Sequence, residues 1–205
     1  MKLSKVSVAE ALTPVRVTAE AIAPWVALVE SAYRGDASRA GWTTEADLLS
    51  GQRLNAAMAA EVLAQDDTVV FAVPAHVPGV DEASTSAPEA VTAFAASVQL
   101  VRTNEREAYL GMFAVSPDQQ GSGLGSRLMV WAENWVRSQW GVRNIRMTVI
   151  RQRSELIEFY RRRGYEPTGE TEPFPYDDER FGTPLRDDLE FVVLSKRFSE
   201  SLTTP

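Results

Sequence analysis

The amino-acid sequence predicts an α/β protein with a single mixed, largely antiparallel sheet and helices on both faces of that sheet. The segments follow one another as a strand, two helices, three strands, a helix, a strand, a helix and closing strands. Three strands in succession are typical of an antiparallel meander. The strand–helix–strand step from Val115 to Val149 predicts a parallel crossover. The length of 205 residues suits one domain over 1–205 with a sizeable buried core.

The N-terminal part of the chain predicts a short strand and at least two helices. Residues 15–17 have strand character, and residues 23–34 predict a helix. A second helix or helix pair is expected within 41–65, beginning at Thr44, because Asp47 three residues later approximates a capping box. The first helix is indicated by apolar residues at helical spacing, which are Trp25, Leu28, Val29 and Ala32.

The middle of the chain predicts three strands. Residues 68–73 are rich in β-branched side chains and read as a short strand. Residues 90–101 and 107–115 read as two longer strands. The segment between the short strand and the first longer strand is rich in Pro, Ala, Ser and acidic residues, which predicts a flexible loop at about 74–89. That loop is either a long hairpin connection or a linker.

The C-terminal part alternates helices and strands. A helix follows the glycines near residue 123, a strand covers 144–150, and a second helix covers 154–165 with Gly164 as its stop signal. The closing strand is expected over 189–198. One face of the first of these helices is marked by large apolar residues, which are Leu124, Leu128, Trp131 and Trp135.

Composition excludes several functional classes. The formal net charge of −7 argues against nucleic acid as a partner and is compatible with a cationic or amine partner. The absence of cysteine excludes disulfides, a cysteine nucleophile and thiolate metal sites. The one histidine, His76, lies in a Pro- and Ala-rich segment unsuited to a rigid base, so no metal site is expected. No apolar run is long enough to cross a membrane, and we expect a soluble, cytoplasmic protein.

The stretch "MFAVSPDQQGSGLGSRLM", residues 112–129, has the composition of a phosphate-binding turn between a strand and a helix. Backbone amides at a helix N-terminus favour a diphosphate, and glycines allow it to approach closely. A P-loop is excluded because no glycine precedes a lysine, and the dinucleotide fingerprint fails because its third glycine falls on Ser126. A glycine-rich turn chosen only for a tight connection is the structural alternative.

A third phosphate-binding pattern, Q/R-x-x-G-x-G/A, is matched by Gln120, Gly123 and Gly125. On this match the chain resembles the GNAT family of acetyl-CoA-dependent N-acetyltransferases over about residues 12–198. The most specific parts are "YLGMFAVSPDQQGSGLGSRLM" and, about forty residues later, "LIEFYRRRGY".

The resemblance implies the GNAT (acyl-CoA N-acyltransferase) fold with acetyl-CoA as donor and CoA as product. Strands "MFAV" and "MTVI" are then expected to splay apart, so that pantetheine pairs with the main chain of Phe113, Ala114 and Val115. The diphosphate would be bound at the turn by Gln120, Gly121, Ser122, Gly123, Leu124, Gly125 and Ser126.

The resemblance also implies that Tyr160 is a general acid that gives a proton to the departing CoA thiolate. A phenol with a pKa of about 10 is a slightly weak acid for this task, so concerted transfer or a lowered pKa is expected. Core packing is the alternative role for Tyr160. Arg153 stands where many relatives carry asparagine, and the asparagine's role is not transferred to it. The general base is left open between a water relay and several side chains, which are Glu45, Asp47, Glu107, Tyr109, Asp177, Asp178 and Glu179.

The expected acceptor is a primary amine of a small molecule or peptide, which attacks the thioester directly in a ternary complex. Two other functions stay open: a non-catalytic module that binds CoA, and transfer of a longer acyl chain or acylation of protein lysines. Assembly as a homodimer is also left open. The family places its acceptor site beside the first helices and the loop between the last two strands, which here points to Tyr33, Trp42, Glu45, Tyr176 and Asp177.

Overall fold

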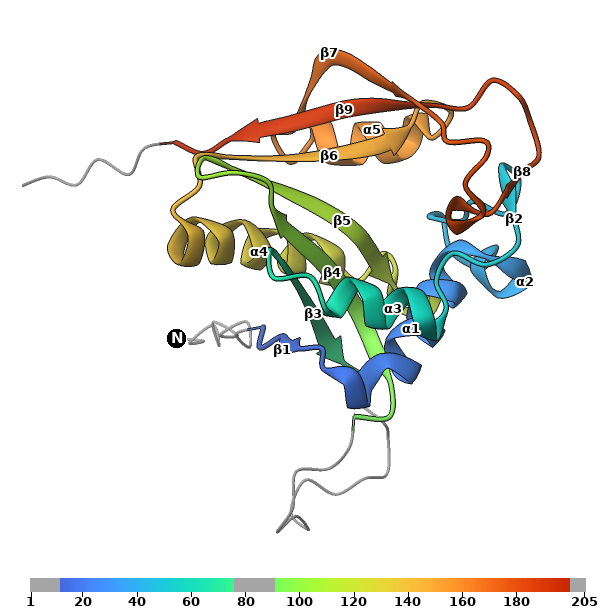
Figure 1. Cartoon of the computed structure of the whole chain (residues 1–205), viewed down its shortest axis with the longest axis horizontal. Coiled ribbons are helices and arrows are strands. Elements are labelled where there is room, and N and C mark those ends of the chain that lie inside the picture. The colour runs from blue at the N-terminus through green and yellow to red at the C-terminus, as the bar shows by residue number, and fades with distance from the viewer. Residues whose placement is uncertain (1–11, 76–90, 200–205) are drawn as a thin grey trace, which may run out of the picture.

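The computed structural model describes residues 12–75 and 91–199 and has the predicted mixed α/β architecture (Figure 1). The large sheet has seven strands in the order β1-β3-β4-β5-β6-β9-β7, and a small sheet pairs β2 with β8. All neighbours in the large sheet are antiparallel except β5 and β6. The strands are β1 Val15–Arg16, β2 Leu49–Ser50, β3 Thr68–Pro74, β4 Phe94–Arg102, β5 Glu107–Val115, β6 Asn144–Ile150, β7 Glu166–Pro173, β8 Thr183–Pro184 and β9 Glu190–Arg197.

Helices cover both faces of the large sheet, as the sequence predicts. On one face α4 and α5 pack in a core with Val98, Leu100 and Met147, and on the other α1 and α3 pack with Val70 and Ala72. Full burial of one such aliphatic side chain contributes about 1.5–3 kcal/mol, so the two cores hold the helices on the sheet. The helices are α1 Ile22–Tyr33, α2 Gly35–Ser38, α3 Ala56–Leu63, α4 Leu124–Trp140 and α5 Ser154–Arg161, with 3₁₀ turns η1 Ala19–Ala21, η2 Pro117–Gln119 and η3 Glu179–Phe181.

The prediction of a helix beginning at Thr44 is wrong. Residues 41–55 form turns and strand β2, and α3 begins only after Asn55, whose side chain accepts a hydrogen bond from the Met58 amide. The Thr44 hydroxyl bonds the Ala46 amide and the Ser38 hydroxyl instead of capping a helix. Contacts with distant segments prevent a helix here. The Glu45 amide donates a hydrogen bond to a carbonyl of α1, and strand β2 pairs with strand β8.

Strand β7 was not located by the sequence. Its residues include Pro, Gly and three Glu, and all are exposed except the half-buried Glu172. An edge strand that buries no face has no apolar alternation to reveal it. The predicted flexible loop at about 74–89, like His76, falls outside the described residues except for its first two positions. The single-domain organisation stays a prediction.

No helix in the described part of the chain is both long enough and apolar enough to span a membrane.

Candidate functional site

Strands β5 and β6 are paired at one end only. Their register joins Glu107 to Asn144, Ala108 to Ile145 and Tyr109 to Arg146, and no pair between them follows. Beyond this point β5 stays paired with β4, and β6 stays paired with β9 as far as Ile150. Figure 1 shows the two ribbons diverging toward their carboxyl ends. The predicted splay is therefore present, and it leaves a gap in the middle of the sheet.

A β-bulge in β5 shapes the edge of this gap. Gly111 lies opposite Gln99 and Ala114 lies opposite Ser97, so two residues of β5 face a single residue of β4. One of the two is Met112, which has a φ of 40°, in the left-handed region. The other is Phe113, whose carbonyl accepts a 2.8 Å hydrogen bond from the Tyr33 hydroxyl of α1. The bulge thus turns the Phe113 main chain toward α1.

The glycine turn has the conformation that its sequence requires. Gly121 and Gly123 have φ angles of +83° and +84°, which side chains other than glycine rarely adopt. A Cβ on either residue would meet no atom within 4 Å, so the space beside them is open. At Gly125 a Cβ would lie 3.2 Å from a Val115 methyl group, so this glycine allows α4 to pack closely on β5.

The turn leaves backbone N–H groups available at the N-terminus of α4. Among the described residues, none accepts a hydrogen bond from the amides of Gly121, Gly123, Gly125 or Ser126. The first amides of a helix have no intrahelical acceptors, and the helix dipole favours an anion beside them. The three other amides of the predicted set are already bonded within the turn, that of Gln120 at 3.4 Å and those of Ser122 and Leu124 at 3.3 Å each.

Gln120 uses its side chain inside the protein. Its Oε1 accepts from the Trp42 amide at 2.8 Å, while its Nε2 donates to the Thr43 hydroxyl at 2.8 Å and to the Val115 carbonyl at 3.0 Å. A Cβ at Gly41 would lie 2.6 Å from Gln120 Oε1, so a larger residue there would displace the Gln120 side chain. The Gln120 side chain therefore ties the glycine turn to the loop after α2.

A cavity of about 270 Å³ opens beside the turn. Its wall combines the glycines with aromatic side chains of α5 and with Arg153 and Arg163, which flank that helix. Arg163 lies over the Phe159 ring at 3.5 Å from its centroid. Arg163 also donates to the Ser126 hydroxyl. Trp42, predicted to contact the acceptor, lines this cavity instead and packs on Phe159 at 5.2 Å between ring centroids. Open amides, glycines and a nearby guanidinium could hold phosphate groups here.

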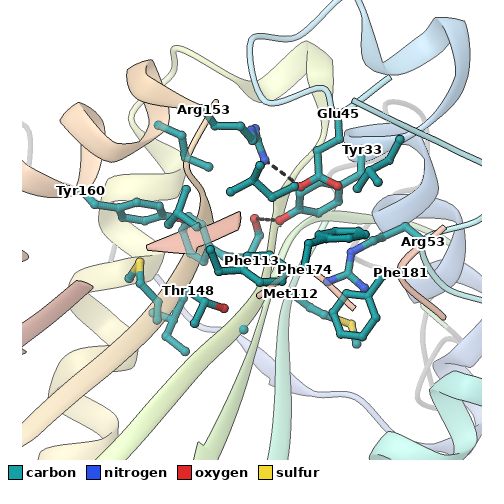
Figure 2. Close-up of a pocket in the computed structure, with 18 of the residues that line it drawn as sticks. Tyr33, Glu45, Arg53, Met112, Phe113, Thr148, Arg153, Tyr160, Phe174 and Phe181 are labelled. Carbon is teal, nitrogen blue, oxygen red and sulfur yellow. Dashed lines mark hydrogen bonds and ion pairs between the residues drawn. The ribbon is translucent and has the colours of Figure 1, made fainter. Parts of the chain in front are cut away.

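A second, smaller cavity of about 110 Å³ occupies the gap between β5 and β6 (Figure 2). Its floor includes Tyr109 and Thr148, whose hydroxyls are 2.9 Å apart, and its far wall is aromatic. Phe174, Phe181 and Phe191 form most of that wall. The two cavities meet, because they share five residues, which are Tyr33, Phe113, Arg153, Leu156 and Tyr160.

Tyr160 lies at the junction of the two cavities and is only 5% exposed. No hydrogen bond joins its hydroxyl to any other part of the described chain. Burial raises the pKa of Tyr160 well above its ordinary value, and Tyr33 adds to this effect while Arg153 opposes it. The direction is opposite to the lowered pKa considered from the sequence. The hydroxyl therefore stays protonated and can act as a hydrogen-bond donor.

Glu45 is locked between two arginines at the edge of the smaller cavity. Its carboxylate bonds Arg34 at 2.5 Å and Arg153 at 3.0 Å, and all three side chains are less than a tenth exposed. Burial raises the pKa of Glu45, but the two guanidinium groups outweigh burial and hold it below its ordinary value. A carboxylate held in this way is a poor general base. Arg153 also donates a hydrogen bond to the Thr43 carbonyl at 2.5 Å. Its guanidinium is therefore held by Glu45 and Thr43 together.

Two other residues that were predicted to contact the amine acceptor lie outside both cavities. Tyr176 and Asp177 are exposed and line neither cavity, and the Tyr176 hydroxyl accepts from the Leu189 amide at 2.6 Å. Sequence reasoning missed Arg53 and Phe181, which line the smaller cavity together. They are far apart in the chain and match no motif, so no local signal could have paired them.

The remaining base candidates are occupied or remote. Asp47 pairs with Arg39 at the surface, Asp178 pairs with Arg180, and Glu107 accepts a hydrogen bond from Asn144. Tyr109 is the one member of the set, besides Glu45, that lines the smaller cavity. Within the described residues the cavity thus offers no unpaired carboxylate.

Comparison with known proteins agrees with this geometry. The profile of the acetyltransferase (GNAT) family matches residues 80–165. The uncharacterized N-acetyltransferase YesJ of Bacillus subtilis (strain 168) is 39% identical over 66 residues, which are 32% of this chain and 36% of that protein. The chain therefore matches only about a third of the length of this curated relative.

Two solved structures share the fold over most of the chain. An N-acetyltransferase from Staphylococcus aureus Mu50 has a TM-score of 0.60 at 12% identity, covering 90% of this chain and 96% of that one. A mutant of the spermidine N-acetyltransferase SpeG from Vibrio cholerae has a TM-score of 0.57 at 13% identity, and the match covers 91% of this chain and 95% of that one. At such low identity these likenesses show a common fold. With the family match over residues 80–165 and the splayed strands beside the glycine turn, they show that the chain is similar to the GNAT family in part of its sequence and shares the fold of these acetyltransferases.

Proposed function

We propose that this chain transfers the acetyl group of acetyl-CoA to a primary amine of a small molecule or peptide. The observation that carries the proposal is the meeting of two cavities at Tyr160. One cavity lies at a helix N-terminus with open amides, and the other lies between the splayed strands. A donor and an acceptor could therefore reach the same point from opposite sides, as direct attack in a ternary complex requires. The predicted cytoplasmic location is part of the same proposal.

The larger cavity fits the coenzyme. When bound, acetyl-CoA supplies an acetyl group activated as a thioester. The amides of Gly121, Gly123 and Gly125 would hold its diphosphate, because they lack acceptors and the space beside the first two is open. The main chain of residues 113–115 would hold pantetheine in the gap, like an added strand. Arg163 lies close enough to this wall to add a positive charge.

The smaller cavity would favour the neutral form of the amine. An alkyl amine has a pKa near 10, so removing its proton at pH 7 costs roughly 4 kcal/mol. Arg53 and Arg153 line the cavity, and the one carboxylate in its wall, Glu45, is already paired with two arginines. Nearby positive charge lowers the pKa of an amine. The amine can then lose its proton to water, without a dedicated carboxylate base.

Tyr160 would supply the proton that the departing thiolate needs. A free thiol has a pKa of about 8.5, whereas the pKa of buried Tyr160 lies above that of an ordinary phenol. Complete proton transfer to a free thiolate would thus be uphill. Transfer concerted with departure of the sulfur, or a hydrogen bond that strengthens as charge develops on it, fits the raised pKa better.

The Tyr160→Phe variant tests this role. We expect turnover to fall at least tenfold while acetyl-CoA affinity changes little, because the ring and its packing are kept and only the hydroxyl is lost. Thiol release with a mixture of amines measures turnover, and calorimetry measures affinity. Tyr165→Phe is the matched control, since its hydroxyl is also buried but the residue lines neither cavity.

An unchanged rate in Tyr160→Phe would contradict the acid role. Binding of CoA by the wild-type protein with no thiol release for any amine would instead favour the non-catalytic module.

A further inference from the structure

Arg53 is a cation without an ionic partner in the wall of the smaller cavity. Its guanidinium carbon lies 5.9 Å from the Tyr33 ring centroid and 6.0 Å from that of Phe181 (Figure 2). Within the described residues, no hydrogen bond or ion pair is made by this guanidinium. Arg34 and Arg153, by contrast, are both paired with the Glu45 carboxylate.

The main chain holds Arg53 in place while its side chain stays unpaired. One oxygen of the Glu30 carboxylate accepts from the amides of Arg53 and Leu54, at 2.6 and 2.7 Å. Glu30 is thus used by the backbone, and it does not line the cavity. Glu45 lies close enough for Arg53 to help lower its pKa, but that carboxylate is already shared between two other arginines. The backbone of Arg53 is thus tied to α1, and the charge of its side chain remains available to a ligand.

We infer that the amine acceptor is a compact amino acid whose carboxylate pairs with Arg53. This inference rests on the proposed acetyl transfer and names the class of acceptor for it. A guanidinium presents a planar fork of donors that matches a carboxylate, and such charged hydrogen bonds are the strong ones. The wall has two arginines and one paired carboxylate, so a second ammonium group on the acceptor would be repelled. Polyamines are therefore disfavoured.

The position of Arg53 limits the acceptor further. Arg53 lines both the smaller cavity of about 110 Å³ and a neighbouring cavity of about 300 Å³. The Tyr33 hydroxyl bonds Phe113 at the junction, and Arg53 lies beside the ring of the same tyrosine. About one phenol ring therefore separates the Phe113 carbonyl from the Arg53 guanidinium. The carbon atoms between the two ends of the acceptor would contact Leu49, Phe174 and Phe181.

Matched pairs of acceptors test this inference. Glycine, β-alanine, γ-aminobutyrate and L-leucine are each compared with their carboxamides, and spermidine is added as a polyamine. We expect kcat/KM for at least one acid to exceed that for its carboxamide at least tenfold. The carboxamide of an α-amino acid has the less basic amine, so intrinsic reactivity works against this result.

Substitutions of Arg53 test whether this residue causes the preference for acids over carboxamides. Arg53→Gln should remove the difference between acid and carboxamide by raising KM for the acid, and Arg53→Lys should keep part of it. Arg151→Gln is the matched control, because Arg151 pairs with Glu190 at the surface and lines neither cavity. Thermal unfolding of each variant checks that the fold is kept.

Two outcomes separate this inference from the proposed function. If carboxamides or spermidine are acetylated as well as the acids, and Arg53→Gln lowers all rates equally, the inference is overturned while acetyl transfer stands. If no amine releases CoA, acetyl transfer fails, and titration of the acids against the CoA-loaded protein decides the inference. Binding of an acid that depends on Arg53 then supports a carboxylate site, and absence of binding by every acid overturns it.

Discussion

Tyr33 illustrates how single side chains connect the two cavities. Its hydroxyl donates to the Phe113 carbonyl at the junction, and its ring lies beside the Arg53 guanidinium. Burial raises the pKa of Tyr33 to about 12, and Glu45 adds to this effect, so the hydroxyl is a donor at every physiological pH. One residue of α1 thus touches the main chain of the predicted coenzyme site and the wall of the predicted acceptor site.

Glu45 is the residue at which we expect the largest loss of stability. Glu45→Gln would leave Arg34 and Arg153 buried without a counter-charge, and breaking such a pair costs about 3–5 kcal/mol. Urea unfolding at pH 7 measures this loss. Asp47→Asn is the matched control, because its pair with Arg39 is exposed and should contribute less than about 1 kcal/mol.

Glu45 should also make the free energy of unfolding depend on pH. Since the folded-state pKa of Glu45 is lowered, its contribution is complete above the unfolded pKa of about 4.3 and is lost as the pH falls through the folded value. The difference between wild type and Glu45→Gln should therefore shrink under strongly acidic conditions. Equal stability of the two proteins at pH 7 would contradict the role of this ion pair.

At the scale of the element, α4 is bounded by a left-handed glycine at each end. Gly123 precedes it with a φ of +84°, and Gly141 follows it with a φ of +67°. Gly123 has no side chain to cap the N-terminus, and only the Leu124 amide is bonded by the Ser122 hydroxyl, so the amides of Gly125 and Ser126 remain available. The apolar stripe predicted from the sequence includes Leu124 and Leu128, which are buried against the sheet. The helix therefore anchors the glycine turn while it leaves the amides open.

A pair of glycine substitutions separates backbone strain from coenzyme binding. Gly123→Ala and Gly141→Ala should each lose about 1–2 kcal/mol of stability, because both force alanine into a left-handed conformation. Only Gly123→Ala should weaken CoA binding, by at least tenfold, because its Cβ enters the open space beside the amides. Thermal unfolding and calorimetry with CoA measure the two effects. Equal CoA affinity in the two variants would argue against a phosphate site at this turn.

At the scale of the whole molecule, the sheet is two antiparallel halves joined at one end. Strands β1, β3, β4 and β5 form one half, and β6, β9 and β7 form the other, with parallel pairing confined to residues 107–109 and 144–146 (Figure 1). Across the open end, Arg153 bonds Thr43 and Arg34 bonds the Phe181 carbonyl. The small β2–β8 sheet joins the same two regions. A coenzyme in the gap would add a further bridge between the halves.

Coenzyme binding should therefore be visible in the whole fold. At 100 times its dissociation constant, CoA should stabilise the folded protein by about 2.7 kcal/mol, measured as a rise in Tm. Hydrogen exchange should slow at the amides of residues 110–115, which border the gap, and change little at 107–109, which are already paired with β6. Uniform protection of both segments, or no rise in Tm, would argue against binding in the gap.

Short sequence patterns were enough to predict the helices and the glycine turn that surround the site. Helical spacing marked Trp25, Leu28, Val29 and Ala32, all of which are buried. Gly121 and Gly123 have the left-handed angles that only glycine adopts easily, so sequence and conformation agree there. The splay was implied by family resemblance, and the register of β5 and β6 confirms it.

The sequence by itself therefore determined the central strands of the sheet, the helix after the glycine turn and the conformation of that turn, because periodicity and glycine conformation act over a few residues. Tertiary structure decided the acceptor side. It brought Arg53 beside Phe181, paired Glu45 with two arginines, placed Trp42 on the larger cavity and kept residues 41–55 out of a helix. These outcomes depend on contacts between segments distant in the chain, whose energies exceed local propensity and leave no mark in any short stretch of sequence.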